Sequence, residues 1–391
     1  MSHVVIRQLQ IDETVNIIRR LGAYAFRSTP PLPEPSEWQK ERAYLRESAY
    51  FAVFEDDKAV AGSAVYAMTQ NIRGQLYAAG GIGSVSTHPA GRRKGYARKM
   101  LTHLFTYHNE QGHAVSLLYP FRESFYMRLG YATFTQPKKV RFAPAALQPL
   151  LKQDLGGEIE LVEIAEGFEA YRAFVEKQQQ NIHGLGRFTP LVESWLQTTN
   201  PYWLAIARVR GEIKAMMLYK ITDYGADMKV EHFWYDDVQG RYLLLEWFAR
   251  HIDQIKEVEL VLPPFEHPET WWSDLDIHIT AINPPLGRII NIDRLAGLQT
   301  GPGSFTARIR DEYCPWNQRT YRFESSDGKL QISESAQADC ELSIQALTSL
   351  IYGTHEPATF EFRDWGNPSA ELQTVMRSMF PAMQPYLHQE F

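Results

Sequence analysis

The 391-residue sequence has few cysteines and no long apolar run. Its two cysteines, Cys314 and Cys340, form neither a disulfide framework nor a metal-ligand pattern. No apolar stretch approaches the roughly 18 residues that span a bilayer, and Met1–Gln10 lacks the plan of a secretory signal. We therefore expect a reduced, cytoplasmic protein with no membrane partner.

Positive charge is also scarce overall. Forty lysines and arginines face 46 acidic residues, which gives a net charge of −6 and argues against a nucleic-acid partner. The 12 histidines form no H-E-x-x-H motif, so we expect no metal. A G-x-S-x-G nucleophile elbow is absent, because G-I-G-S-V fails the spacing.

Basic residues are concentrated in one segment, Arg92–Arg98, with the sequence R-R-K-G-Y-A-R. Ile82–Thr87 before it has the composition of a buried strand, and Lys94–His108 repeats apolar residues at helical spacing. The unpaired N–H groups and the dipole of a helix start favour an anion, and Gly95 lets the backbone approach phosphate oxygens. A solvated basic helix start is the alternative. The strand expected at Ala114–Tyr119, after the helix, favours a diphosphate site.

Arg92-x-x-Gly95-x-Ala97 after such a strand resembles the coenzyme A pyrophosphate motif of the GNAT acetyltransferase superfamily. The expected element order over residues 1–143 is that of the GNAT fold. It runs through a strand at Val4–Leu9, helices capped by Asp12 and Ser36, strands at Tyr50–Glu55, Ala59–Met68 and Leu76–Thr87, the motif helix, a strand at Ala114–Tyr119, a short helix ended by Gly130, and a closing strand pair within Ala132–Phe142.

Two further domains follow a linker at Ala143–Gly157. Residues 158–284 repeat the pattern, but Tyr235–Arg241 has no basic glycine-bearing cradle, so we expect a degenerate GNAT-like domain that binds no coenzyme A. Residues 286–391 resemble the sterol carrier protein fold. The expected fold class is α/β (α+β): tandem GNAT domains, the second degenerate, followed by a sterol-carrier-protein-like domain.

Three units in this order resemble the enhanced intracellular survival (Eis) family of GNAT acetyltransferases. The resemblance implies acetyl transfer from acetyl-CoA to an amine by direct attack on the thioester. Small-molecule amines such as aminoglycosides or polyamines, and lysine side chains, are the implied acceptors, and a homohexamer is the implied assembly. The alternative is a non-catalytic protein whose sterol-carrier-like domain binds an apolar ligand while the GNAT domains serve as scaffold.

The resemblance also implies roles for single residues. Tyr126 would donate a proton to the leaving thiolate, since a phenol of ordinary pKa near 10 lies close to a thiol near 8.5. Phe391 would place its terminal carboxylate in the site as a base, although a frayed chain end is the alternative. Some family members carry an acidic residue where this chain has Phe26, which argues against aminoglycosides.

Backbone N–H groups of the strand would bind pantetheine and polarise the thioester carbonyl. The implied coenzyme-binding residues are Val85, Ser86 and Thr87 on the strand, Arg92, Arg93, Lys94, Gly95, Tyr96, Ala97 and Arg98 in the pyrophosphate loop, and Phe121 and Arg122 as further walls, while Trp38 and Glu390 would line the amine pocket.

Overall fold

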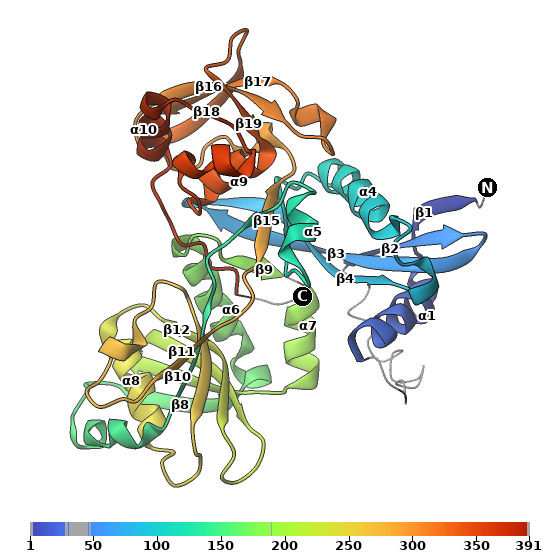
Figure 1. The fold of residues 1–391 in the computed structure, drawn as a ribbon. Helices are drawn as coiled ribbons and strands as arrows, with labels where there is room; N and C mark the ends of the chain where they lie inside the picture. The colour runs from blue at the N-terminus through green and yellow to red at the C-terminus, as the bar shows by residue number, and fades with distance from the viewer. Residues whose placement is uncertain (1–2, 28–29, 31–45, 47, 189, 389–391) are drawn as a thin grey trace. The chain divides into compact units, whose positions relative to one another are not determined.

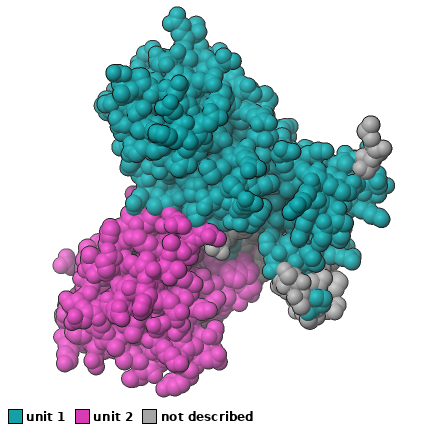
Figure 2. All heavy atoms as spheres, viewed as in Figure 1, with its two compact units in different colours: residues 1–135, 182–192, 284–391 teal, residues 136–181, 193–283 magenta. Residues whose placement is uncertain are grey.

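The computed structural model describes residues 3–27, 30, 46, 48–188 and 190–388 (Figure 1). The helix expected after Ser36 lies outside the described residues. The chain divides into two compact units (Figure 2). Unit 1 comprises residues 1–135, 182–192 and 284–391, and unit 2 comprises residues 136–181 and 193–283. Within the described part of the chain, every helix is too short or too polar to cross a membrane.

The first sheet belongs to unit 1 and has the order β1-β2-β3-β4-β5-β15-β6, with β9 pairing with β3. All neighbours on this path are antiparallel except β4 and β5, which are parallel and joined by helix α4 (Tyr96–Glu110). The strands are β1 (Val4–Gln8), β2 (Ser48–Glu55), β3 (Lys58–Ile72), β4 (Gln75–Thr87), β5 (Val115–Leu118), β6 (Ala132–Thr133), β9 (Gly186–Phe188) and β15 (Leu286–Ile289).

Helices α1 (Ile11–Gly22) and α4 cover opposite faces of this sheet (Figure 1). The alternation of β2 explains the arrangement, because successive side chains of a strand point to opposite faces. Phe51 and Val53 pack with Leu101 and Leu104 of α4, whereas Tyr50 and Ala52 pack with α1. The sheet is therefore buried on both faces.

Most expected elements of the first domain are confirmed, with small corrections. Asp12 does not cap α1: the cap is Gln10, whose backbone N–H donates to Glu13 Oε2 at 3.0 Å. The short helix α5 (Glu123–Met127) ends before Gly130. Gly130 has a φ of +95°, and a Cβ there would lie 2.7 Å from Arg288 Nε, so it makes room for that guanidinium.

The closing strand pair expected within Ala132–Phe142 is wrong. Strand β6 stays in the first sheet, but β7 (Lys138–Phe142) pairs with β13 and β14 in the second sheet. Strand β15, which the sequence assigned to the third domain, pairs with β5 and β6 in the first sheet. The linker expected at Ala143–Gly157 contains a 3-10 helix, Pro144–Lys152, with buried leucines.

Unit 2 repeats the architecture of the first domain, as expected. Its sheet has the order β14-β7-β13-β12-β11-β10-β8, and its parallel pair, β12 and β13, again flanks a helix, α8 (Val238–Ala249). The start of α8 is capped by Asp237, whose Oδ1 accepts from Gly240 N at 2.8 Å. The other elements are β8 (Glu158–Glu163), α6 (Ile164–Asn181), α7 (Pro190–Thr199), which spans the boundary between the units, β10 (Trp203–Val209), β11 (Glu212–Ile221), β12 (Met228–Tyr235), β13 (Val258–Leu262) and β14 (His278–Ala281).

The C-terminal part of unit 1 is a four-stranded sheet of order β18-β17-β16-β19 with two helices. Phe305 and Leu347 share one hydrophobic core with Met68 and Ile72 of the first sheet, so the two sheets of unit 1 are packed into a single body. The elements are β16 (Ser304–Arg310), β17 (Thr320–Ser326), β18 (Lys329–Glu334), β19 (Cys340–Ser343), α9 (Ile344–Tyr352) and α10 (Ala370–Met379).

Unit 1 also buries neutral histidines. His108 Nδ1 lies 2.8 Å from His113 Nδ1, and burial lowers the pKa of His113 to about 4. His183 Nδ1 accepts from Arg73 N at 3.0 Å, and burial lowers its pKa to about 4 as well. These rings carry no charge in the folded protein at neutral pH.

Acidification is therefore expected to destabilise the protein. Between about pH 6.5 and 4 the unfolded chain binds protons at His113 and His183 that the folded chain does not, so stability falls as the pH falls. Each histidine contributes about 1.4 kcal/mol per pH unit within this window. Urea midpoints from pH 7 to 4.5 measure the slope. His183→Gln should make stability depend less steeply on pH, whereas His278→Gln, at an exposed position, should leave the slope unchanged. Equal slopes for the wild type and both variants would show that His183 is not the source of the pH dependence.

Candidate functional site

Strands β4 and β5 separate near the middle of the first sheet. Their parallel pairing joins Ala79–Gly81 to Val115–Leu117, and the rest of β4, from Ile82 onward, pairs only with β3. The register between β3 and β4 shifts here, from Gly62↔Ser86 to Ala64↔Gly83. At and beyond this bulge, residues 82–87 of β4 line a cavity together with Tyr119, which directly follows β5.

We call this opening the inner cavity. It has a volume of 470 Å³ and is lined on one side by residues 82–87 of β4 and on the other by aromatic side chains. Ser86 is 3% exposed, and its hydroxyl has no hydrogen-bond partner among the described residues. The aromatic residues are Phe26, Tyr119, Phe121, Phe125 and Tyr126.

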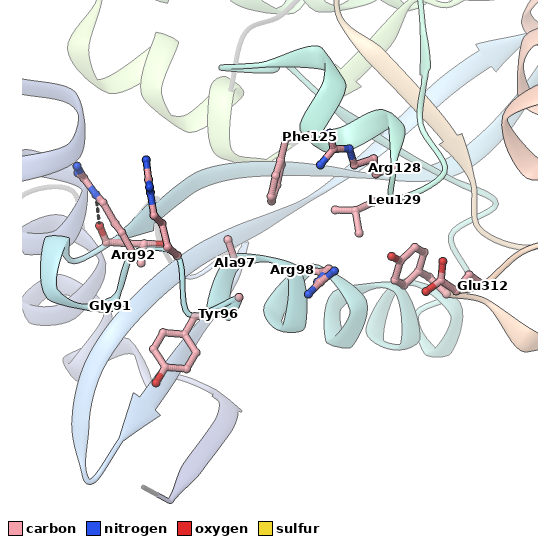
Figure 3. A pocket seen from close by; sticks show the side chains of 13 residues that line it. Gly91, Arg92, Tyr96, Ala97, Arg98, Phe125, Arg128, Leu129 and Glu312 are labelled. Atoms are coloured by element: carbon pink, nitrogen blue, oxygen red, sulfur yellow. Dashed lines mark hydrogen bonds between the residues drawn. The ribbon is translucent and has the colours of Figure 1, made fainter. Parts of the chain in front are cut away.

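A second cavity, the outer cavity, continues from the first. It has a volume of 640 Å³ and shares Thr87, Arg92, Ala97 and Phe125 with the inner cavity. Figure 3 shows Arg92 at one end and Glu312 at the other. The two cavities together form one channel along β4 and across the start of α4.

The turn into α4 is built for close approach by a ligand. Gly95 caps the helix with a φ of +81°, and a Cβ there would meet only Arg98 Nη2, at 3.9 Å. The backbone at this helix start is thus reachable from the outer cavity. Because the first N–H groups of a helix lack intrahelical partners, they can donate to an anion in the cavity.

The structure brings most of the expected coenzyme residues together. Arg92, Arg93 and Arg98 line the outer cavity, and Arg92 Nε donates to Thr87 O at 3.4 Å. Lys94 is instead paired with Glu55 at 2.9 Å. The remaining expected residues in the lining are Val85 and Ser86 of the inner cavity, Thr87 and Ala97 of both, and Gly95 and Tyr96 of the outer cavity.

The other expected residues lie in different places. Phe121 lines the inner cavity, whereas the exposed Arg122 donates to Ser124 Oγ at 3.1 Å and is not part of either described lining. The substrate-pocket residues Trp38 and Glu390, and the catalytic candidate Phe391, lie outside the described residues.

Tyr126 lies on α5 and faces the inner cavity. It is 3% exposed, and its ring packs edge-on against Phe121 and Phe125 at centroid distances of 5.7 and 5.0 Å. Burial raises the pKa of Tyr126 well above 10, so the ordinary value assumed from the sequence is wrong. The phenol therefore stays protonated at physiological pH and keeps an O–H that can donate a hydrogen bond.

The chain returns to the inner cavity at its C-terminal end. Tyr119 OH, in the cavity wall, donates to Leu387 O at 2.7 Å, and Tyr386 N donates to His183 O at 2.9 Å. Tyr386 and Leu387 are buried. The described chain therefore ends beside the cavity that contains Tyr126.

Several lining residues were not identified from the sequence. Phe125 and Arg128 come from α5 and its end, and Glu312 and Tyr313 come from the segment between β16 and β17. Arg128 lies two residues after Tyr126, and this proximity could have suggested that Arg128 lines the same site. No local pattern marks Glu312 and Tyr313, because only the tertiary fold brings them to the cavity.

The acetyltransferase (GNAT) domain family matches residues 5–134, and the sterol carrier protein domain family matches residues 294–388. A search of curated proteins finds no match. A GCN5-related N-acetyltransferase from Anabaena variabilis shares 16% identity over 100% of both chains, with a TM-score of 0.86.

Two further solved structures are similar over nearly the full length. A GCN5-related N-acetyltransferase from Kribbella flavida has 16% identity and a TM-score of 0.85, over 100% of this chain and 99% of that one. Eis1 from Mycobacterium abscessus has 17% identity and a TM-score of 0.78, over 99% of this chain and 100% of that one.

The chain contains an acetyltransferase (GNAT) domain, which is followed by a second GNAT-like unit and a sterol carrier protein domain. Its full-length fold is that of Eis1, so the protein is Eis-like in architecture. The presence of a GNAT acetyltransferase domain favours the enzyme over the non-catalytic scaffold.

Proposed function

We propose that this protein is an acetyl-CoA-dependent N-acetyltransferase whose inner cavity holds the thioester and whose outer cavity holds the diphosphate. One observation carries the proposal: the opened edge of β4 leads directly to a glycine-capped helix start surrounded by arginines. An extended pantetheine chain can hydrogen-bond to such an edge as an added strand. The anionic diphosphate then reaches Arg92, Arg93 and the backbone at Gly95.

The reaction is a direct transfer. A neutral amine attacks the thioester carbon, backbone N–H groups at residues 85–87 stabilise the developing oxyanion, and the C–S bond breaks as the amide forms. The nitrogen loses its extra proton to a base, for which the terminal carboxylate of Phe391 is the expected candidate. The departing thiolate accepts a hydrogen bond from Tyr126. Because burial holds the pKa of this phenol above that of a thiol, we assign it the role of donor, with full protonation of the thiolate following from solvent.

Both residues expected to line the amine pocket lie outside the described residues, and the identity of the acceptor is part of the proposal. Phe26 and Phe121 line the inner cavity and are 67% and 73% exposed. Aromatic walls bind apolar groups. We propose an amine attached to an apolar body as acceptor, with polyamines, lysine peptides and aminoglycosides as alternatives that thiol-release assays compare. The terminal carboxylate of Phe391 as base and the homohexamer remain predictions from the Eis resemblance. The cytoplasmic location remains a prediction from the sequence.

Gly95→Asp is expected to weaken acetyl-CoA binding by at least about tenfold. The new side chain would occupy the approach to the helix start, strain a backbone with positive φ, and repel the diphosphate. Isothermal titration calorimetry measures the affinity. Gly225→Asp, at a turn with a φ of +74° in unit 2, is the matched control for backbone strain. An unchanged affinity in Gly95→Asp would rule out this helix start as the diphosphate site.

A further inference from the structure

The far end of the outer cavity is formed by the C-terminal domain. Glu312 and Tyr313 belong to the segment between β16 and β17, and they line the same cavity as Arg98 of the motif helix. Figure 3 shows Glu312 at the end opposite Arg92, with Arg98 and Leu129 between them. A molecule that fills this cavity must therefore touch both domains.

A buried carboxylate holds this segment in place. The side chain of Asp311 is 0% exposed, and its Oδ1 accepts from Arg288 Nη2 at 2.6 Å. The same oxygen accepts from the backbone N–H groups of Tyr313 and Cys314 at 3.3 and 3.1 Å, while Oδ2 accepts from Asn317 Nδ2 at 3.0 Å. The backbone that carries Glu312 and Tyr313 is thus fixed before any ligand arrives.

Arg288 ties this segment to the opposite wall of the cavity. Its Nε donates to the carbonyl of Leu129, a lining residue, at 2.7 Å, and its guanidinium lies 4.4 Å from the centre of the Phe105 ring on α4. One buried guanidinium therefore sets the distance between the GNAT wall and the C-terminal wall.

Tyr313 presents a neutral aromatic ring in this wall. It is half-buried, and its ring packs edge-on against Phe105 at a centroid distance of 6.5 Å. Burial raises the pKa of Tyr313, the Glu312 carboxylate raises it further, and the Arg98 guanidinium lowers it. Glu312 and Arg98 therefore both lie close to the phenol.

The covalent order of coenzyme A decides which part reaches this wall. Pantetheine lies on one side of the diphosphate, and 3′-phosphoadenosine lies on the other. With the thioester in the inner cavity and the diphosphate at Gly95, the nucleotide extends along the outer cavity towards Tyr313. The guanidinium groups of Arg98 and Arg128 can bind the 3′-phosphate. The Tyr313 ring can stack on adenine, and the Glu312 carboxylate can accept a hydrogen bond from the adenine amino group.

We propose that the C-terminal domain supplies the adenine-binding wall of the coenzyme site, with the Tyr313 ring packed on the base and the Glu312 carboxylate accepting from its amino group. The inference rests on the proposed function. It gives the sterol carrier protein domain a part in binding the acetyl donor, and it makes Arg288 and Asp311 positioning residues for the nucleotide.

The test compares ligands with and without the nucleotide. Tyr313→Ala is expected to weaken binding of acetyl-CoA and of 3′-phosphoadenosine 5′-phosphate by about tenfold, because an aromatic stacking partner of a base is lost. Turnover with acetyl-pantetheine, which has no nucleotide, should keep its wild-type kcat/KM. Tyr313→Phe keeps the ring and should bind both ligands as the wild type does. Tyr224→Ala, at a position 87% exposed in unit 2, is the control for the loss of a tyrosine ring elsewhere.

Glu312 has a separate readout. The wild type should prefer acetyl-CoA over its hypoxanthine analogue, in which an oxygen replaces the adenine amino group, and Glu312→Ala should lose that preference. If Tyr313→Ala binds acetyl-CoA as the wild type does, or if it loses acetyl-pantetheine turnover equally, the adenine wall is overturned. If the wild type itself binds no acetyl-CoA, the proposed function fails instead.

Discussion

Asp311→Ala is expected to lower the free energy of unfolding of unit 1 by about 3 to 5 kcal/mol, the largest stability effect that we predict. The substitution leaves the Arg288 guanidinium buried, with side-chain exposure of 0%, and without its counter-ion. Burial is the largest influence and disfavours that charge, but Asp311, Cys314 and Tyr131 together outweigh it, so that the pKa of Arg288 is raised. The backbone N–H groups of Tyr313 and Cys314 also lose their acceptor.

Urea unfolding measures the global loss, and amide hydrogen exchange at residues 313 and 314 measures the local one. The surface pair of Arg319 and Asp293 is the control, because these side chains are 39% and 54% exposed. Asp293→Ala should cost less than about 1 kcal/mol. If both aspartate variants were equally stable, Asp311 would not be the anchor of the segment. If the coenzyme affinity of Asp311→Ala were unchanged, its positioning role would be removed.

Tyr126→Phe is expected to lower kcat by about a hundredfold while the dissociation constant for acetyl-CoA stays within about twofold of wild type. The ring, which packs against Phe121 and Phe125 in the lining of the inner cavity, is retained, and only its O–H is lost. Steady-state thiol release gives kcat, and calorimetry gives the affinity. Since burial raises the pKa of Tyr126, the wild-type rate should show no loss from phenol ionisation up to pH 10.

Tyr131→Phe provides a matched control. This tyrosine is fully buried 6.0 Å from the Tyr126 ring, and its hydroxyl is 2.8 Å from Ser116 Oγ, away from the described cavity linings. It should reduce stability but leave kcat nearly unchanged. Full turnover by Tyr126→Phe would show that the thiolate departs without a hydrogen bond from Tyr126.

The sequence was informative where function depends on local spacing. The strand through Thr87, the turn with Gly95 and the helix that follows could be predicted, because apolar periodicity and a glycine with positive φ are local properties. The hairpin between β2 and β3, with Asp56 and Asp57 at positive φ, was predictable for the same reason. The repeat of the architecture in unit 2 followed from the same periodicities.

The sequence was uninformative where function depends on partners far apart in the chain. Strand β15 is four residues long and fully buried, so no alternation shows which sheet it joins. Tyr313 reaches the cavity only through Arg288 and Asp311, and the Lys94 pairing with Glu55 depends on the turn of a distant hairpin. Burial of Tyr126, which changes its pKa, is likewise a tertiary property.

The return of β15 to the first sheet has a consequence for biosynthesis. A ribosome releases residues 1–135 long before residues 286–289, so during that interval β5 has an open hydrogen-bonding edge where β15 will later pair. Residues 136–283 can complete their own sheet first, because all seven of its strands lie within them. The GNAT domain, although first in the chain, is therefore completed only after the second unit has been translated. A nascent chain halted before residue 286 would expose this edge to other strands.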